Sequence, residues 1–231
     1  MRYPLILLPG MMCDARLFYP QIAAISGRWP VFTAPICGAN NMQKLAQDIL
    51  QVAPPIFSLA GLSMGGIVAM EILRQAPERV DRLALLDTNP LPETASMKAK
   101  RATQMDAVKV GSLERVIREE MKPNYLIGGP DKQKISELCM KMANDKGAQA
   151  FVNQSLALRD RRDQREILSN FSGRSLVLCG EFDILCSPER HKLMSELLVN
   201  SRLEIIEDAG HLPTLEQPDP VNAAIMRWLE G

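Results

Sequence analysis

The chain has 231 residues, enough for one large domain or a domain with an insert, and too few for two ordinary enzymes. Hydrophobic residues make up 46% and charged residues 23%, which excludes a disordered, collagen-like or coiled-coil protein. Lysine plus arginine equals aspartate plus glutamate, at 27 each, so no overall field attracts nucleic acid or an anionic membrane. We therefore expect a globular protein that recognises its partner locally.

The N-terminal segment and the cysteines indicate the cellular compartment of the protein. The apolar run between Pro4 and Pro9 is too short for a signal peptide, and no run of ~18 apolar residues predicts a transmembrane helix. The five cysteines are scattered and form no Cys-x-x-Cys or zinc-like pattern: Cys13, Cys37, Cys139, Cys179 and Cys186. We expect free thiols, a cytoplasmic location and no bound metal.

Six short apolar runs recur along the chain. Their continuous hydrophobicity predicts strands buried on both faces, as in a parallel sheet covered by helices. The runs are 5–8, 31–34, 56–60, 83–86, 176–179 and 203–206, and helical patterns lie between them at 43–52, 64–75 and 189–198. Asn40 and Asn41 precede the first of these helices, and Ser187-Pro188 opens the last. This alternation predicts an α/β fold with a mostly parallel, doubly wound sheet.

The alternation breaks at residues 90–167, which contain no convincing strand. Helical patterns occur there at 95–110, 113–121, 132–144 and 147–158. A structureless loop of this length would be unusual in a compact domain, so we predict a helical cap insert at 90–167. The catalytic core would then comprise 1–89 and 168–231.

Two features of this insert bear on its role. It contains five methionines, which fit either an adaptable apolar pocket wall or ordinary helix packing: Met97, Met105, Met121, Met140 and Met142. The charged clusters at 98–101 and 159–165 are interpreted as solvated helix surface.

The strongest motif is Gly61-Leu62-Ser63-Met64-Gly65, which lies between an apolar run and a helical pattern. Gly-x-Ser-x-Gly in a strand–turn–helix setting is typical of a nucleophile elbow, whose strained turn lifts the serine hydroxyl above the sheet edge. Side chains at 61 and 65 would collide in so tight a turn, and Gly66 lets the helix start close to the strand. We therefore predict that Ser63 is a nucleophile.

A serine nucleophile needs a base, and the chain has two histidines. His211 follows the run 203–206 through a loop that could deliver the imidazole to the sheet edge. His191 lies in a helical pattern among charged neighbours, which predicts a solvated surface histidine. His211 is therefore the predicted base.

The base needs a carboxylate that orients the imidazole. Asp183 follows the run 176–179, whereas Asp87 ends the run 83–86 and is the competing candidate. Asp208 is better explained as a turn residue. The chain order Ser, Asp, His favours Asp183.

Backbone N–H groups can stabilise the oxyanion that forms during attack. We predict that Met64 N–H, just after the nucleophile, and Met11 N–H, beside Gly10 in the first loop, are these donors. The first loop, Ser63, Asp183 and His211 all follow predicted strands, and this edge is where open α/β sheets place their sites.

Together these motifs resemble the α/β-hydrolase family, in the form of a single-domain serine hydrolase or esterase with a helical cap. The resemblance rests on Leu7-Leu8-Pro9-Gly10-Met11, Gly61–Gly66, Gly180-Glu181-Phe182-Asp183 with Pro188, Gly210-His211-Leu212-Pro213 with Glu216 and Pro218, and Trp228-Leu229. It implies a Ser63–His211–Asp183 triad, an acyl-enzyme intermediate, no cofactor, and a substrate lid inserted after Asp87.

Two departures from the family pattern are visible. Pro9-Gly10 replaces the His-Gly that many members have, so the loop hydrogen bonds of that histidine must be replaced. The first strand resembles the family's third, so we expect the N-terminal antiparallel strands to be missing. Ser63 in place of aspartate argues against the family's dehalogenases and epoxide hydrolases.

The sequence thus predicts a carboxylesterase-like serine hydrolase acting on a carboxylic ester or related acyl compound. A thioesterase, a lactonase, an acyltransferase and a carbon–carbon bond hydrolase could use the same triad, and a non-catalytic small-molecule binding protein could use the same fold. The expected partner is a small-molecule acyl substrate, with neither nucleic acid nor membrane; nothing in the sequence indicates the oligomeric state. The balanced charge and the methionine-bearing cap predict a largely apolar or weakly charged substrate.

Overall fold

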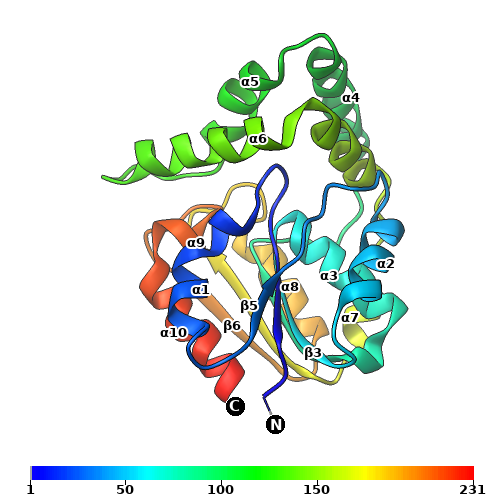
Figure 1. The fold of residues 1–231 in the computed structure, drawn as a ribbon, viewed down its shortest axis with the longest axis vertical. Coiled ribbons are helices and arrows are strands. Elements are labelled where there is room, and N and C mark those ends of the chain that lie inside the picture. The colour runs from blue at the N-terminus through cyan, green and yellow to red at the C-terminus, as the bar shows by residue number, and fades with distance from the viewer. Residues whose placement is uncertain (1) are drawn as a thin grey trace.

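The computed structural model describes residues 2–231 as one parallel sheet between helices, with a further helical layer above one end of the sheet (Figure 1). The strands are β1 (Leu5–Leu8), β2 (Val31–Thr33), β3 (Phe57–Leu62), β4 (Val80–Leu86), β5 (Arg174–Gly180) and β6 (Ser201–Ile206). Their order is β2-β1-β3-β4-β5-β6, and every pair is parallel. The predicted α/β class and parallel sheet are confirmed, and no antiparallel strand joins the sheet within the described residues.

Helices cover both faces of the sheet. On one face lie α1 (Tyr19–Ile25) and α10 (Pro218–Glu230), and on the other lie α2 (Met42–Val52), α3 (Met64–Gln75), α7 (Arg165–Ser169) and α8 (Pro188–Leu197). Side chains of β1 alternate between the two cores: Leu5 and Leu7 pack with the first group, and Ile6 and Leu8 with the second. Continuous hydrophobicity therefore reflects burial on both faces, as predicted.

Two helix ends test the capping predictions. The Asn41 side chain accepts a hydrogen bond from Lys44 N at 2.8 Å and caps α2, as expected. Ser187 precedes α8, but its side chain makes no capping bond. Helix α10 was not predicted from the sequence, although Pro218 and Pro220 both fit the first turn of a helix.

The helices of the region 90–167 lie above the C-terminal end of the sheet (Figure 1). They are α4 (Ala95–Lys109), α5 (Leu113–Arg115), a π-helix (Val116–Met121), a short 3₁₀ turn (Lys122–Asn124) and α6 (Lys132–Arg159). The two helices predicted at 132–144 and 147–158 are both present within α6, separated by a kink at Gly147, whose backbone (φ 78°, ψ 177°) is non-helical. The division into core and cap at these exact boundaries stays a prediction, and α7 crosses the boundary at 167.

No helix within residues 2–231 is both long enough and apolar enough to span a bilayer. All five cysteines are free thiols, as predicted.

Candidate active site

Ser63 occupies the sharp turn between β3 and α3. Its backbone has φ 55° and ψ −116°, a strained conformation for a residue with a side chain. A Cβ atom at Gly61 would lie 2.3 Å from the Gly65 carbonyl oxygen, and one at Gly65 would lie 2.0 Å from the Leu8 carbonyl oxygen. The turn therefore requires glycine at both positions, for the steric reason that the sequence suggested.

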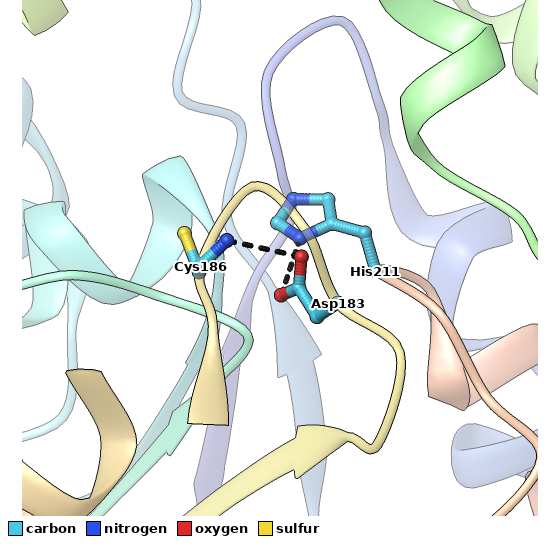
Figure 2. A group of neighbouring side chains, drawn as sticks. All are labelled: Asp183, Cys186 and His211. Atoms are coloured by element: carbon cyan, nitrogen blue, oxygen red, sulfur yellow. Dashed lines mark hydrogen bonds and ion pairs between the residues drawn. The ribbon is translucent and has the colours of Figure 1, made fainter. Parts of the chain in front are cut away.

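A chain of hydrogen bonds joins Ser63, His211 and Asp183. The Ser63 Oγ to His211 Nε2 distance is 3.0 Å, and the His211 Nδ1 to Asp183 Oδ2 distance is 2.8 Å. Asp183 Oδ1 also accepts hydrogen bonds from the main-chain N–H groups of Leu185 and Cys186, and Figure 2 shows how the carboxylate faces His211. The three side chains come from the loops after β3, β5 and β6, and their order along the hydrogen-bond chain fits a nucleophile (Ser63), a base (His211) and an orienting acid (Asp183).

The surroundings of Asp183 favour its ionised form. Burial alone would raise the pKa of this carboxyl group, but the charge and hydrogen bond of His211 and the N–H groups of Cys186 and Leu185 lower it below its ordinary value. Asp183 is thus negatively charged at neutral pH, as stabilisation of a protonated imidazole requires.

The competing candidate, Asp87, is fully buried and makes no hydrogen bond to His211 within the described chain. Its Oδ1 accepts a hydrogen bond from Gly180 N at 2.9 Å, and its Oδ2 has no partner. Burial, with the nearby Asp183 charge, raises its pKa well above the ordinary value, so its surroundings favour the neutral form. Since His211 Nδ1 pairs with Asp183 and not with Asp87, Asp183 is the carboxylate placed to stabilise an imidazolium.

The prediction that His191 is a solvated surface residue is wrong, because this side chain is 0% exposed. Its Nε2 accepts a hydrogen bond from Thr88 N at 3.1 Å, and its Nδ1 lies 3.0 Å from the Ser187 carbonyl oxygen. The charged neighbours on α8 suggested a solvated face, but His191 and Met194 lie on the buried face of that helix. Thr88 Oγ1 donates to the Ser63 carbonyl oxygen at 2.7 Å, so His191 braces the turn that holds the nucleophile.

Burial lowers the pKa of His191 to about 4, and this predicts a pH-dependent stability. Between pH 6.5 and 4 the unfolded chain binds a proton here that the folded chain does not, so stability falls as the pH falls through this window. The loss attributable to His191 should be about 3 kcal/mol between pH 7 and 4. Urea unfolding of wild type and His191→Gln at both pH values measures it, and equal losses in the two proteins would contradict the assignment.

The two predicted oxyanion donors are not used by hydrogen bonds of the fold. Within residues 2–231, neither Met11 N–H nor Met64 N–H has a hydrogen-bond acceptor. The neighbouring Met12 N donates to Gln154 Oε1 at 2.9 Å, and Gln154 Nε2 donates to the Ile36 carbonyl oxygen at 3.0 Å. The buried Gln154 amide, from α6, thus ties the loop after β1 to the segment after β2.

Glu216, a half-buried residue that the sequence analysis left without a role, holds the backbone around His211. Its Oε2 accepts hydrogen bonds from Gly210 N at 3.0 Å and Leu212 N at 3.1 Å, and its Oε1 accepts from Ile127 N at 3.0 Å. His211 N itself donates to the Tyr125 carbonyl oxygen at 2.8 Å. The loop of the base is therefore tied to the loop before α6 on both sides of the imidazole.

Replacing Glu216 with glutamine should lower kcat by about 10- to 100-fold, because the amide NH₂ would oppose main-chain donors and shift His211. Steady-state kinetics on a small ester measures this, with KM expected to change less than kcat. The matched control is Glu207→Gln, an exposed residue near the same loop. Equal effects of the two substitutions would show that Glu216 does not position the base.

Ser63 and His211 line a cavity of about 220 Å³ between the sheet edge and the helices above it. Met97 and Met121 also line it and fit the interpretation as a pocket wall. Met105, Met140 and Met142 are buried and fit the interpretation as helix packing.

The interpretation of both charged clusters as solvated surface is wrong for two residues. Arg101 and Arg161 line the cavity, and both form ion pairs with the buried Glu93.

One group of metal-ligating side chains occurs within residues 2–231, and it overlaps this site. The potential ligand atoms of Asp183, Cys186 and His211 lie within 4.8 Å of one another (Figure 2). Burial, and then the charge of Asp183, raises the pKa of the Cys186 thiol well above its ordinary value, whereas a metal takes the thiolate. Both ring nitrogens of His211 take part in the hydrogen-bond chain, so the group fits proton transfer better than metal binding.

Comparison with known proteins points to esterases and related hydrolases. The chain is 23% identical over 197 residues to a pimeloyl-[acyl-carrier protein] methyl ester esterase of Nitrosospira multiformis, covering 80% of this chain and 73% of that protein. It is 24% identical to a carboxylesterase of Bacillus subtilis, in an alignment that covers 98% of this chain and 80% of that protein.

Solved structures agree with these relatives. A thermophilic esterase from Thermogutta terrifontis, solved with malate bound, superposes with a TM-score of 0.90 at 28% identity, over 99% of this chain and 89% of that one. The enol-lactonase from Burkholderia xenovorans shares the fold, with a TM-score of 0.88 at 16% identity over 100% and 92%. The sequence profile of the alpha/beta hydrolase family matches residues 6–224. Since that match spans nearly the whole chain and includes Ser63, Asp183 and His211, this protein belongs to the α/β-hydrolase family.

Proposed function

We propose that the protein is a serine hydrolase that cleaves a carboxylic ester or a related acyl compound through an acyl-enzyme intermediate. The observation that carries this proposal is the unbroken hydrogen-bond chain from Ser63 through His211 to Asp183, whose first two members line a cavity. Esterase relatives support the same reaction class.

The geometry suggests the following sequence of steps. His211 Nε2 accepts the Ser63 proton as Oγ attacks the carbonyl carbon, and the charge of Asp183 stabilises the resulting imidazolium. The main-chain N–H groups of Met11 and Met64 bind the oxyanion. Collapse of the tetrahedral intermediate returns the proton to the leaving alcohol and leaves an ester on Ser63. Water, deprotonated by His211, then attacks this ester and releases the carboxylic acid.

Hydrolysis of 4-nitrophenyl acetate with and without added methanol tests this proposal. Hydrolysis predicts acetate as the main product, with nitrophenol release that requires Ser63. Methyl acetate as the main product would instead show an acyltransferase that uses the same residues. No turnover of acyl esters of any chain length, with ligand affinity unchanged in Ser63→Ala, would favour a binding protein and overturn the proposal.

A further inference from the structure

The cavity beside Ser63 contains an excess of cationic side chains, although the chain as a whole is neutral. Four cations and two carboxylates line it: Lys100, Arg101, Arg161 and Arg190, with Glu93 and Glu120. In a confined and partly desolvated space, such an excess attracts an anion.

Two of these arginines are buried around a single carboxylate. Glu93 Oε1 lies 2.6 Å from Arg101 Nη2 and 2.8 Å from Arg161 Nη1, and the exposed fractions of the Glu93, Arg101 and Arg161 side chains are 2%, 13% and 8%. Two positive charges share one negative charge, so the group keeps one unit of positive charge. Burial of an unbalanced charge costs free energy, which a bound anion would offset.

Both guanidinium groups retain donors for a ligand. Arg101 directs Nε and Nη2 to Glu93, while its Nη1 meets only the Met11 thioether sulfur, a weak acceptor, at 3.7 Å. Arg161 directs Nε to the Leu91 carbonyl oxygen and Nη1 to Glu93 and the Leu158 carbonyl oxygen; its Nη2 has no acceptor among the described residues. The planar guanidinium matches the geometry of a carboxylate, so these donors suit that group.

The position and size of the site limit the ligand. Because Arg101 contacts the side chain of Met11, it lies beside the loop proposed to hold the oxyanion. A cavity of about 220 Å³ is smaller than the ~300–1,000 Å³ of sites for drug-sized ligands. We propose that the substrate is a small ester or related acyl compound that carries a carboxylate away from the cleaved bond, and that Arg101 and Arg161 bind this carboxylate.

This inference rests on the proposed hydrolase function and replaces the expectation of an apolar or weakly charged substrate. That expectation used the net charge of the chain, which says nothing about how charges are distributed. The fold brings Arg101 on α4 and Arg161 after α6 to one carboxylate, and no local pattern in the sequence reveals this.

A matched pair of substrates tests the preference for a carboxylate. The half methyl esters of dicarboxylic acids from malonic to adipic acid are compared with the corresponding amides, in which CONH₂ replaces the carboxylate at nearly the same size. A second series tests a carboxylate on the alcohol side of the ester. It compares acetate esters of hydroxy acids with acetate esters of the corresponding neutral hydroxy amides. At the best chain length, kcat/KM should favour the acid by about 10- to 100-fold. Amides that react as fast as the acids in both series would overturn the proposal.

Variants assign the preference to the arginines. Arg161→Gln and Arg101→Gln should each lower the ratio of acid to amide by about tenfold or more. The matched control is Arg118→Gln, which makes the same change of charge on an exposed side chain outside the cavity and should keep the ratio. Arg161→Lys and Arg101→Lys give a further test if the glutamine variants do not fold, because lysine keeps the charge but loses the planar pair of donors that matches a carboxylate, so the ratio should still fall. An unchanged ratio in every folded cavity variant would contradict the assignment.

Binding measured without turnover separates this inference from the hydrolase proposal. Calorimetric titration of Ser63→Ala with succinate and glutarate should show binding that Arg161→Gln, added to Ser63→Ala, weakens by about tenfold or more. Such binding would support the carboxylate site even if no ester were cleaved. Neutral esters cleaved by Ser63, with no preference for acids and no dicarboxylate binding, would overturn the site and leave the hydrolase proposal standing.

Discussion

Replacing Ser63 with alanine is expected to reduce kcat for ester hydrolysis by about 10⁴- to 10⁶-fold, because the acyl-enzyme can no longer form. Alanine is similar to serine in size and fits the same backbone, so the fold should be retained. The assay is steady-state hydrolysis of a small ester, with urea unfolding to confirm that stability is unchanged.

The control for this substitution is Ser169→Ala, which removes an exposed hydroxyl on α7 far along the chain from the site. Wild-type activity is expected there. If Ser63→Ala kept more than a tenth of wild-type kcat, the hydroxyl would not be the nucleophile, and direct attack by water would have to be considered.

The second large effect is expected from Asp183→Asn, with a loss of about 10⁴-fold in kcat. Asparagine keeps the size of the side chain but removes the charge that stabilises the imidazolium. It can also donate its amide hydrogens to His211 Nδ1, which favours the tautomer that cannot accept the Ser63 proton. Raising the pH should not restore the activity, because no group that could regain the charge remains.

Asp87→Asn is the matched control, since it makes the same chemical change at the other buried carboxyl group near the site. The surroundings of Asp87 favour its neutral form, and an asparagine oxygen can still accept the hydrogen bond from Gly180 N. We expect less than a tenfold loss of kcat. A larger loss at Asp87 than at Asp183 would reverse the roles that we assign to the two residues.

Much of the fold could be predicted from the sequence because its signals are local. All six strands were found from runs of apolar residues, since a strand buried on both faces needs no polar alternation. Ser63 and its glycines were identifiable because steric limits in the turn impose them. Asp183 and His211 were identifiable because each follows a strand, and the ends of parallel strands meet at one edge.

The remaining features depend on contacts between distant segments. His191 was interpreted as a surface residue because its sequence neighbours are charged, but the packing of α8 decides its burial. Arg101 and Arg161 looked like solvated charges until the fold placed both on Glu93. Gln154 is a polar residue among apolar positions of α6, which is a local signal of a special role. Its hydrogen-bond partner, Met12 N in the first loop, is 142 residues away in the chain, so the contact itself could not be predicted.

Intact-mass spectrometry after treatment with a fluorophosphonate tests the central claim most directly, because this reagent phosphonylates activated serine nucleophiles. One adduct per chain is expected in the wild-type protein, with none in Ser63→Ala and much slower labelling in Asp183→Asn. An adduct that persists in Ser63→Ala, or no adduct on the folded wild-type protein, would contradict the assignment of Ser63 as an activated nucleophile.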